Sequence, residues 1–522
     1  MAELTMCRGR SLARIPATAP RRTGHPAVST FLLLTALFSK EATMAKFSTL
    51  TSLSRSPSVP DAINHEGGRA FTQSAKLEFV SILLTTFLED DFYRTEQHTT
   101  ERIRQLITNI NEPRFVAKAA LYVRHAHGLR SVSHLVASEL AKSVKGASWS
   151  KSFFDRIVRR PDDAVEILAC FLALHGRPIP NSLKRGLGAA LGRFDEYQLA
   201  KYRRSQASFK LVDAVNLLHP AATPALSKLV RGELAPAQTW ETKLTEAGQA
   251  GTTADVAVAK AAAWSELVRE RKLGYLALLR NLSNILTHAP EVVDELCQQL
   301  ADERAVRRAL IFPFQFLSAV EVVQGVNRPA ARQVLEALNQ AVDHALVHVP
   351  VFEGATLVAL DSSASMAGRP QAIGSLFAAT LVKATGADLM LFSDDARWMN
   401  LNRRDSTLTL ANSLPFASGG TNFNAIFQRA HRAYERIVIL SDMQGWIGDG
   451  APVQEWADYQ RRHSIRPRIY SFDLEGYGTL QFPQEGVYCL AGWSDRVFEI
   501  MQKLDRDPQA LIHEVDTVEL EA

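Results

Sequence analysis

Oxygen-bearing side chains gather in three short segments in the second half of the chain. The apolar stretch LVAL (357–360) runs directly into DSSAS (361–365), and the stretch RIVIL (436–440) runs into a serine and an aspartate. Between them, the segment GGTN (419–422) adds a threonine. A shell of hydroxyls and carboxylates suits a hard divalent cation, above all Mg²⁺, and argues against zinc. The residues expected to hold this ion are Asp361, Ser363, Ser365, Thr421 and Asp442.

The same segments admit simpler interpretations. Aspartate and serine are common helix caps, so Ser362 or Ser363 could do no more than cap the helix that follows. A two-ion nuclease or phosphatase would need several bridging carboxylates, and the expected ligand set holds two. Asp394 and Asp395 could add to that set, but we expect them to be turn or helix caps. Because no Ser/His/Asp triad or Cys/His pair is evident nearby, we expect a binding site and no enzyme activity. The nuclease or phosphatase stays an alternative.

The segments that must position these oxygens read as alternating strands and helices. Such alternation is typical of a parallel sheet covered by helices on both faces, an open doubly wound α/β domain. Ligands of such sheets bind beyond the carboxyl ends of the strands, so the oxygen-bearing segments are expected to meet there. The predicted strands are 355–361, 387–393, 436–442 and 466–474, and the predicted helices between them include 371–385 and 421–434.

The chain before this domain reads as one helix after another. From about residue 70 to 345, apolar residues recur at spacings of three and four, as in Phe115, Ala119, Tyr122 and Val123. Prolines and glycines mark the breaks between these segments. Paired helices with short connections favour an α-solenoid of the HEAT type, although no fixed-period repeat is evident. The segment 347–354 is the predicted hinge to the α/β domain.

The helical part and the α/β part differ in charge, although the formal net charge of the whole chain is only +4. Residues 101–210 contain 20 Lys and Arg against 9 Asp and Glu, whereas residues 355–522 contain 15 against 21. The basic segment is a candidate polyanion binder, and its interleaved aromatic and histidine side chains could stack on unpaired bases. Any single cation could equally belong to a solvated face or cover apolar surface.

Two family resemblances rest on these segments. DxSxS after a strand, a threonine after a glycine pair and SD after another strand are similar to the metal-ion-dependent adhesion site of von Willebrand factor A domains. All five expected ligands match that pattern. Several blocks of the helical part resemble the TROVE module of the Ro autoantigen family in its bacterial form, and this resemblance covers nearly the whole chain from about Met44. These blocks are NHEGG (64–68), HGLRSVSH (127–134), LKRGL (183–187), YQLAKYR (197–203), LLRNL (278–282) and FPFQFLSA (312–319).

The second resemblance implies a ring of HEAT-like repeats that is closed by the domain with the metal site. It also implies that single-stranded 3′ ends of misfolded non-coding RNA enter the central hole and that small Y RNAs bind the outer basic surface. Family members of this kind work in RNA quality control and stress responses, with exoribonucleases as partners. The residues that match its motifs and are expected to contact RNA are Lys118, Arg130, His134, Lys184, Arg185, Lys201 and Arg203.

We therefore expect a non-catalytic, cytoplasmic RNA-binding protein, a monomer within its ribonucleoprotein and not attached to a membrane. The alternative is a protein-adhesion or chaperone-type module, in which an acidic side chain of the partner completes the shell of the ion. The discriminating residue between the two is Asp361, which matters to the second function and not to RNA affinity.

The cysteines and the first residues of the chain complete the expectations. The four cysteines, Cys7, Cys170, Cys297 and Cys489, are far apart and form no metal-binding pattern or disulfide framework, as is usual in a reducing compartment. Residues 1–43 are arginine-rich, with one apolar run too short to span a bilayer. They are expected to be a disordered leader or to precede the true start, with a targeting segment as the alternative. The expected domains are then 44–350 (RNA-binding helical module) and 351–522 (α/β domain).

Overall fold

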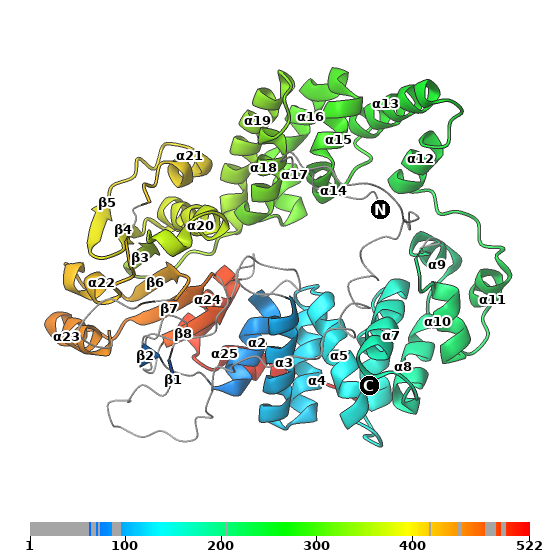
Figure 1. The fold of residues 1–522 in the computed structure, drawn as a ribbon, viewed down its shortest axis with the longest axis horizontal. Helices are drawn as coiled ribbons and strands as arrows, with labels where there is room; N and C mark the ends of the chain where they lie inside the picture. The colour runs from blue at the N-terminus through cyan, green and yellow to red at the C-terminus, as the bar shows by residue number, and fades with distance from the viewer. Residues whose placement is uncertain are drawn as a thin grey trace, which may run out of the picture.

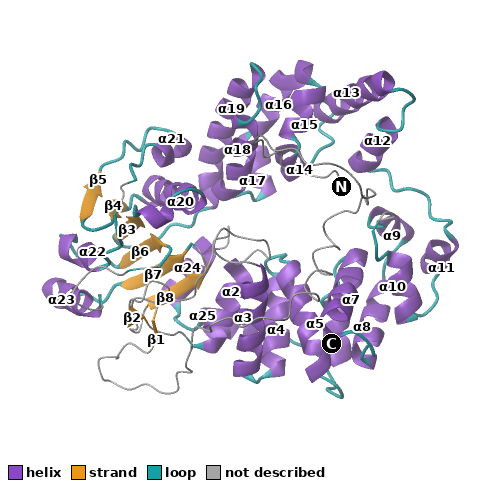
Figure 2. Cartoon of the chain, viewed as in Figure 1, coloured by secondary structure: helices purple, strands orange, loops and turns teal. Residues whose placement is uncertain are grey.

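The computed structural model describes residues 62–63, 69–70, 74–85, 96–203, 207–416, 419–443, 445, 452–474, 487–491 and 497–521. The predictions for residues 1–43 and for the NHEGG segment (64–68) lie outside these residues. A two-stranded ladder of β1 (Ala62–Ile63) and β2 (Arg69–Ala70) precedes a helical part, and a sheet with flanking helices follows it (Figure 2). The α-helices of the helical part are α2 (Ala75–Thr85), α3 (Glu96–Ile110), α4 (Pro113–His125), α5 (Ser131–Ser143), α6 (Ser150–Arg156), α7 (Pro161–His175), α8 (Asn181–Leu191), α9 (Glu196–Lys201), α10 (Leu211–Leu218), α11 (Pro224–Arg231), α12 (Trp240–Ala247), α13 (Thr253–Arg269), α14 (Tyr275–Arg280), α15 (Leu282–His288), α16 (Val293–Leu300), α17 (Glu303–Ala309), α18 (Leu317–Gln324) and α19 (Ala330–Ala345).

The helices follow the apolar spacing of the sequence. Helix α4 starts at Pro113, whose fixed φ and missing N–H suit the first position of a helix. Its residues Phe115, Ala119, Tyr122 and Val123 are all buried, which confirms the predicted pattern. Successive helices pack on one another, α4 against α5, α5 against α7 and α6 against α8. Figure 1 shows the helices continuing in chain order along a curved path, as expected of a solenoid.

The sheet has six strands in the order β5-β4-β3-β6-β7-β8. Because the chain passes from β3 to β4 on one side and then to β6 on the other, the switch point lies between β3 and β6. All four predicted strands are confirmed. The strands are β3 (Thr356–Asp361), β4 (Asp388–Phe392), β5 (Ala396–Met399), β6 (Arg436–Ser441), β7 (Arg468–Asp473) and β8 (Val487–Ala491), and the 3₁₀ turns of the chain are η1 (Pro290–Val292), η2 (Pro313–Phe316), η3 (Leu346–His348) and η4 (Ala364–Met366).

The expectation of an entirely parallel sheet is wrong at one edge. Strand β5 pairs antiparallel with β4, whereas the other pairs of strands are parallel. A tight turn joins β4 to β5, in which the Ser393 N–H donates to the Asp395 carbonyl at 3.0 Å. The two middle residues of β5, Arg397 and Trp398, are exposed. An edge strand this short and exposed has no apolar run to reveal it in the sequence.

The helices of the α/β part cover both faces of this sheet. The predicted helix 371–385 is confirmed, whereas the one expected at 421–434 covers a shorter stretch. Beyond it, the Tyr434 N–H donates to the Tyr459 hydroxyl at 2.9 Å, and the Tyr434 hydroxyl donates to Asp388 at 2.8 Å. These tertiary hydrogen bonds replace the helical ones. The helices are α20 (Arg369–Thr385), α21 (Thr407–Asn412), α22 (Asn424–Arg429), α23 (Val453–His463), α24 (Val497–Arg506) and α25 (Ala510–Asp516).

The helical and α/β parts share a core. The rings of Phe314, Phe377 and Phe498, from η2, α20 and α24, lie 4.9–5.9 Å apart between centroids. At the other end of the path, α25 packs against α4 and α2, and α2 packs against β8. The two ends of the described chain therefore lie side by side (Figure 1). Among the described residues, no helix is both long enough and apolar enough to cross a membrane.

Candidate nucleic-acid interface and metal site

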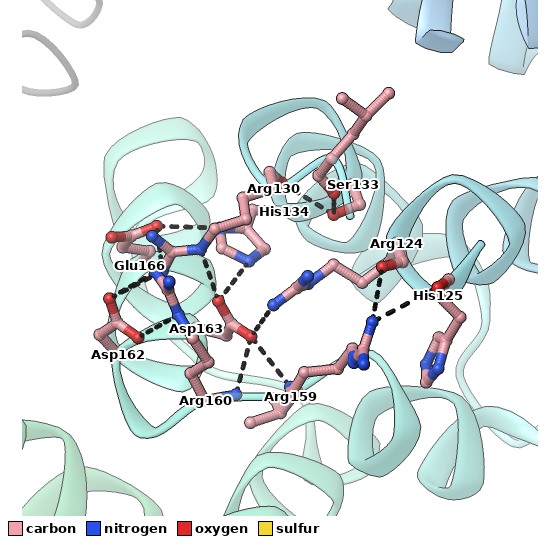
Figure 3. Close-up of polar contacts among 12 residues, drawn as sticks. Arg124, His125, Arg130, Ser133, His134, Arg159, Arg160, Asp162, Asp163 and Glu166 are labelled. Carbon is pink, nitrogen blue, oxygen red and sulfur yellow. Dashed lines mark hydrogen bonds and ion pairs between the residues drawn. The ribbon is translucent and has the colours of Figure 1, made fainter. Parts of the chain in front are cut away.

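A network of buried charges occupies the junction of α4, α5 and α7 (Figure 3). Its centre is Asp163 in the first turn of α7, whose side chain is completely buried. One carboxylate oxygen, Oδ2, accepts from the Arg124 guanidinium at 2.5 Å and from the backbone N–H groups of Arg159 and Arg160 at 2.9 and 3.0 Å. The other, Oδ1, accepts from Arg130 Nε at 2.9 Å. The carboxylate therefore caps α7 and joins three helices.

Arg130 and His134 extend this network along α5. The Arg130 guanidinium also donates to Asp162 at 2.8 Å and lies 3.2 Å from Glu166. The His134 ring lies between two carboxylates, with Nε2 at 3.2 Å from Asp163 and Nδ1 at 3.1 Å from Glu166. Both side chains are largely or fully buried, with 23% and 3% of their surface exposed.

The electrostatics of the network favour its charged form. Burial alone would raise the pKa of Asp163, but His134 and the guanidinium groups of Arg124 and Arg130 outweigh it and hold that pKa well below its usual range. Burial likewise opposes the charge on Arg130, and the carboxylates of Glu166, Asp162 and Asp163 more than offset it and raise the Arg130 pKa. The excess of cations in this region is therefore partly used to hold the helices together.

Lys118, a third residue expected to contact RNA, is also engaged within the protein. Its Nζ donates to the backbone carbonyl of Asp516 in α25 at 2.5 Å. The structure therefore assigns intramolecular partners to three of the seven residues expected to contact RNA, and their contact with RNA stays a prediction.

Other cations of the basic segment have no carboxylate to pair with, because the carboxylates of this segment already have other partners. Glu139 pairs with Arg104 at 2.7 Å, Glu196 pairs with Lys228 at 2.7 Å, and Asp155 pairs with Arg193. Within the described residues, eight lysines and arginines of this segment have no ion pair, no side-chain hydrogen bond and no ring contact, and we call them the unpaired cations. They are Lys142, Lys145, Lys151, Arg177, Lys184, Arg185, Arg203 and Lys210, and all of them are exposed or half-buried.

Lys184, Arg185 and Arg203 belong to both the predicted and the unpaired set. Lys184 and Arg185 lie in the first half of α8, and Arg203 follows α9. The remaining five unpaired cations were missed, because the sequence does not show which carboxylates are already neutralised. The Arg-Arg-Pro-Asp-Asp run at 159–163 was the available signal for the buried network, since acidic residues favour the first turn of a helix.

An aromatic and cationic cluster lies at α9, next to these residues. The Lys201 Nζ lies 6.0 Å from the ring centre of Tyr197 and 5.7 Å from that of Tyr202. The Arg160 guanidinium lies 4.9 Å from the Tyr202 ring centre. The Tyr197 side chain is 53% exposed. Exposed rings among cations can stack on unpaired bases while the cations neutralise phosphates.

The expected metal ligands lie at the carboxyl edge of the sheet, at the switch point. Asp361 ends β3 and is fully buried, and Ser441 at the end of β6 donates its hydroxyl to Asp361 Oδ2 at 2.6 Å. The hydroxyls of Ser363 and Ser365 lie 3.1 Å apart. Asp442 is 2% exposed, directly after β6. Ser441 was missed as the side chain that orients Asp361.

The segment that contains Thr421 reaches the same edge. The Ala364 N–H donates to the Gly419 carbonyl at 3.3 Å, and the Asn422 N–H donates to the Ser393 carbonyl at 2.8 Å, beyond the end of β4. Thr421 between them is 1% exposed. Ser363 occupies the cap position of η4 without a side-chain capping bond, and the Ser362 hydroxyl donates to the Phe392 carbonyl at 3.1 Å. Simple helix capping therefore does not account for these serines.

The chemistry of this donor set fits a hard cation. Burial, and then the nearby Asp442 carboxylate, raise the pKa of Asp361 to about 7. Two adjacent buried carboxylates are stabilised by a bound cation, and hydroxyls supply neutral oxygen ligands beside them. The described residues contain no group of three or more His, Cys, Asp or Glu side chains that could hold a metal ion. An ion at this edge would therefore depend on the hydroxyl ligands as well as on the two carboxylates.

Comparison with known proteins gives a family for the helical part. The model of the TROVE domain matches residues 69–231 and 230–361. Two curated relatives are telomerase protein component 1 of Rattus norvegicus, 24% identical, and of Mus musculus, 25% identical. Each match covers 40% of this chain and 11% of the relative, so the chain spans about a tenth of the length of these proteins.

A solved structure resembles the whole arrangement. The Ro (RSR) protein of Deinococcus radiodurans superposes with a TM-score of 0.60 over 85% of this chain and 99% of its own, at 19% sequence identity. At this identity the likeness concerns the fold, that is, the helical part followed by the sheet.

Proposed function

This chain belongs to the TROVE-domain family, whose members are RNA-binding components of ribonucleoproteins, and we propose that it binds non-coding RNA. Its RNAs would be a Y-like small RNA and the single-stranded 3′ ends of misfolded non-coding RNA, in RNA quality control and stress response. The observation that carries the proposal is the set of eight unpaired cations between residues 142 and 210, which make no ion pair, side-chain hydrogen bond or ring contact among the described residues. Because nearby carboxylates are already neutralised, these cations are available to phosphates.

The unpaired cations and the aromatic cluster contribute to RNA binding in different ways. Lys184, Arg185 and Arg203 neutralise phosphates, which gives affinity without sequence preference. The exposed Tyr197 ring stacks on an unpaired base, which favours single-stranded over double-stranded RNA. The contacts of α25 with α4 and of α2 with β8 support a ring whose hole admits a 3′ end.

At the sheet edge we propose a Mg²⁺ site held by Asp361, Ser363, Ser365, Thr421 and Asp442, which bind the ion without catalysing a reaction. When bound, the ion supplies a coordination position for an acidic side chain of a protein partner, such as an exoribonuclease. The fully buried Asp361 and its neighbour Asp442 support this proposal. If adhesion were the main activity, Asp361→Ala would abolish partner binding and leave RNA affinity unchanged.

The test is to crosslink the full chain to RNA in its native cells, purify it and sequence the bound RNA. We expect one abundant structured small RNA together with fragments that end in unpaired 3′ tails. Recovery of RNA that mirrors total cellular RNA would contradict the proposal. The Lys184→Ala/Arg185→Ala variant should lose most of the bound RNA, and Arg404→Ala/Arg461→Ala, which removes the same charge from the α/β part, is its matched control.

A further inference from the structure

Residues 514–521 run along one stripe of helix α4. Arg114, Lys118 and Tyr122 are spaced four residues apart and therefore line one face of that helix. The segment runs antiparallel to this stripe. Glu514 accepts from the Tyr122 hydroxyl, the Asp516 carbonyl accepts from Lys118, and the Glu521 carboxylate accepts from Arg114 at 3.1 Å.

Helix α6 and the loop before it contribute to the same contact. Arg156, the last residue of α6, donates to the Glu519 carbonyl. The Ser148 hydroxyl donates to the Glu521 carboxylate at 3.4 Å. Three cationic side chains from two helices thus bind acceptor oxygens of the last residue of α25 and of the acidic chain that follows it.

The segment resembles a nucleic-acid backbone in its negative charge and in presenting several acceptor oxygens to a row of cations. Its four acidic residues cover a surface that otherwise carries an excess of cations. Lys142, Lys145 and Lys151 flank Ser148 in the sequence, and within the described residues none of them has an ion-pair partner. A phosphate backbone laid along the α4 stripe would meet the same three cations and these additional lysines.

The segment 514–521 is held firmly at Glu514 and weakly at Glu521. At the firm end, Glu514 also pairs with Lys503 at 2.8 Å, and Leu511 and Val515 are buried. At the weak end, Arg114 and Glu521 are 55% and 59% exposed, and exposed ion pairs contribute little to stability. Among residues 517–521, Leu520 is buried at 1% exposure, and Val518 is half-buried against the same core. The segment can therefore leave the stripe with the loss of only Asp516, the last residue of α25, from that helix.

We propose that the stripe formed by Arg114, Lys118 and Arg156 is a binding site for an RNA phosphate backbone, and that residues 516–521 occupy this site and compete with RNA. The proposal rests on the proposed RNA-binding function and adds a site to it. It also explains why Lys118, which is expected to contact RNA, is engaged within the protein. RNA that reaches this site must first displace the segment, which restricts it to RNAs already held by the unpaired cations.

The test measures binding of a fluorescent single-stranded oligouridylate to the full chain across a salt series. Leu520→Asp removes the anchor, and Val258→Asp places the same charge on an exposed side chain of α13 as the matched control. Three freed cations should steepen the salt dependence by about 2, at roughly 0.7 per contact, which is about an 18-fold larger loss of affinity between 50 and 200 mM salt. Binding at low salt should tighten accordingly. A synthetic peptide of residues 511–521 should reverse the gain.

Arg114→Ala and Arg156→Ala identify the site. Each should have little effect in the parent chain and should remove part of the gain in the Leu520→Asp background. If Leu520→Asp loses its cooperative thermal transition, Glu521→Gln decides instead, because it frees Arg114 and leaves Leu520 in place. It should tighten binding at low salt and steepen the salt dependence by about 0.7.

The outcomes separate the two proposals. An unchanged salt dependence in a folded Leu520→Asp variant, or in Glu521→Gln when the first variant does not fold, would overturn this inference alone. A parent chain that binds no RNA at low salt would overturn the proposed function, whatever the variants do.

Discussion

Replacing Asp163 with asparagine should destabilise the packing of α4, α5 and α7 at their junction. The change keeps the shape of the side chain but removes its charge, and it replaces one acceptor oxygen with an amide that donates. Oδ2 accepts three N–H groups and Oδ1 accepts the Arg130 guanidinium, so at least one donor would then face another donor. The Arg124 side chain, 5% exposed, would lose its partner carboxylate.

The size of the effect follows from the burial of this pair. Breaking a buried, hydrogen-bonded ion pair costs about 3–5 kcal/mol, and Asp163 is completely buried. The remaining carboxylates of Asp162 and Glu166 still serve Arg130, so we expect the lower half of that range, about 3–4 kcal/mol. This corresponds to a rise of more than a hundredfold in the opening equilibrium of the junction, at about 1.4 kcal/mol for each factor of ten.

Hydrogen exchange of the native protein is the suitable assay, because a chain of this size and several parts does not unfold in two states. The amides of α5 and α7 should lose protection by roughly that hundredfold, whereas the sheet should keep its own. Glu303→Gln is the control, since its pair with Arg307 is about half exposed and should contribute less than about 1 kcal/mol. Protection of α5 and α7 within about threefold of the parent chain would refute the structural role assigned to Asp163.

Three further predictions concern RNA, metal and pH. In a fluorescence titration, Lys184→Ala/Arg185→Ala should lower the slope of log affinity against log salt concentration by about 1.4, because two phosphate contacts at roughly 0.7 each are lost. The control Arg404→Ala/Arg461→Ala removes the same charge from the α/β part and should leave this slope unchanged. Mg²⁺ at a hundredfold excess over its Kd should stabilise the α/β part by about 2.7 kcal/mol and so slow hydrogen exchange of its sheet. Asp361→Asn but not Asp395→Asn should abolish this effect, and equal stabilisation of both variants would contradict the site. The pKa of Asp163 in the folded chain lies below its usual value, so its stabilising contribution is complete above about pH 4 and is lost as the pH falls further. Asp163→Asn should therefore flatten the acid limb of a stability–pH curve. An unchanged acid limb would count against this prediction.

The sequence predicts the parts of this molecule that depend on local pattern. Three of the four central strands are visible because each contains a run of four apolar residues, and the fourth, β7, is buried along nearly its whole length with one serine between its apolar residues. The position of the oxygen-bearing segments at the switch point follows from strand and helix alternation alone. Strand β5 was missed because its four residues include two exposed ones and carry no such run.

Contacts between residues far apart in the sequence cannot be predicted from local sequence pattern. Arg130 and Asp162 are 32 residues apart, and their ion pair depends on how α5 packs against α7. Lys118 meets the Asp516 carbonyl across 398 residues, at the junction between the two ends of the described chain. Before the fold is known, a buried structural arginine and an exposed phosphate-binding lysine look alike. The structure separates them by showing which cations already have carboxylate partners.

The central claim is that this chain holds RNA through its unpaired cations and prefers unpaired 3′ ends. The most direct measurement is a gel-shift competition, at two salt concentrations, between one RNA duplex with a single-stranded 3′ tail and the same duplex with blunt ends. We expect tighter binding of the tailed duplex, with a loss of affinity for both as salt rises and a loss of the preference in Tyr197→Ala. Equal affinity for the two duplexes, or no binding to either at low salt, would contradict the account.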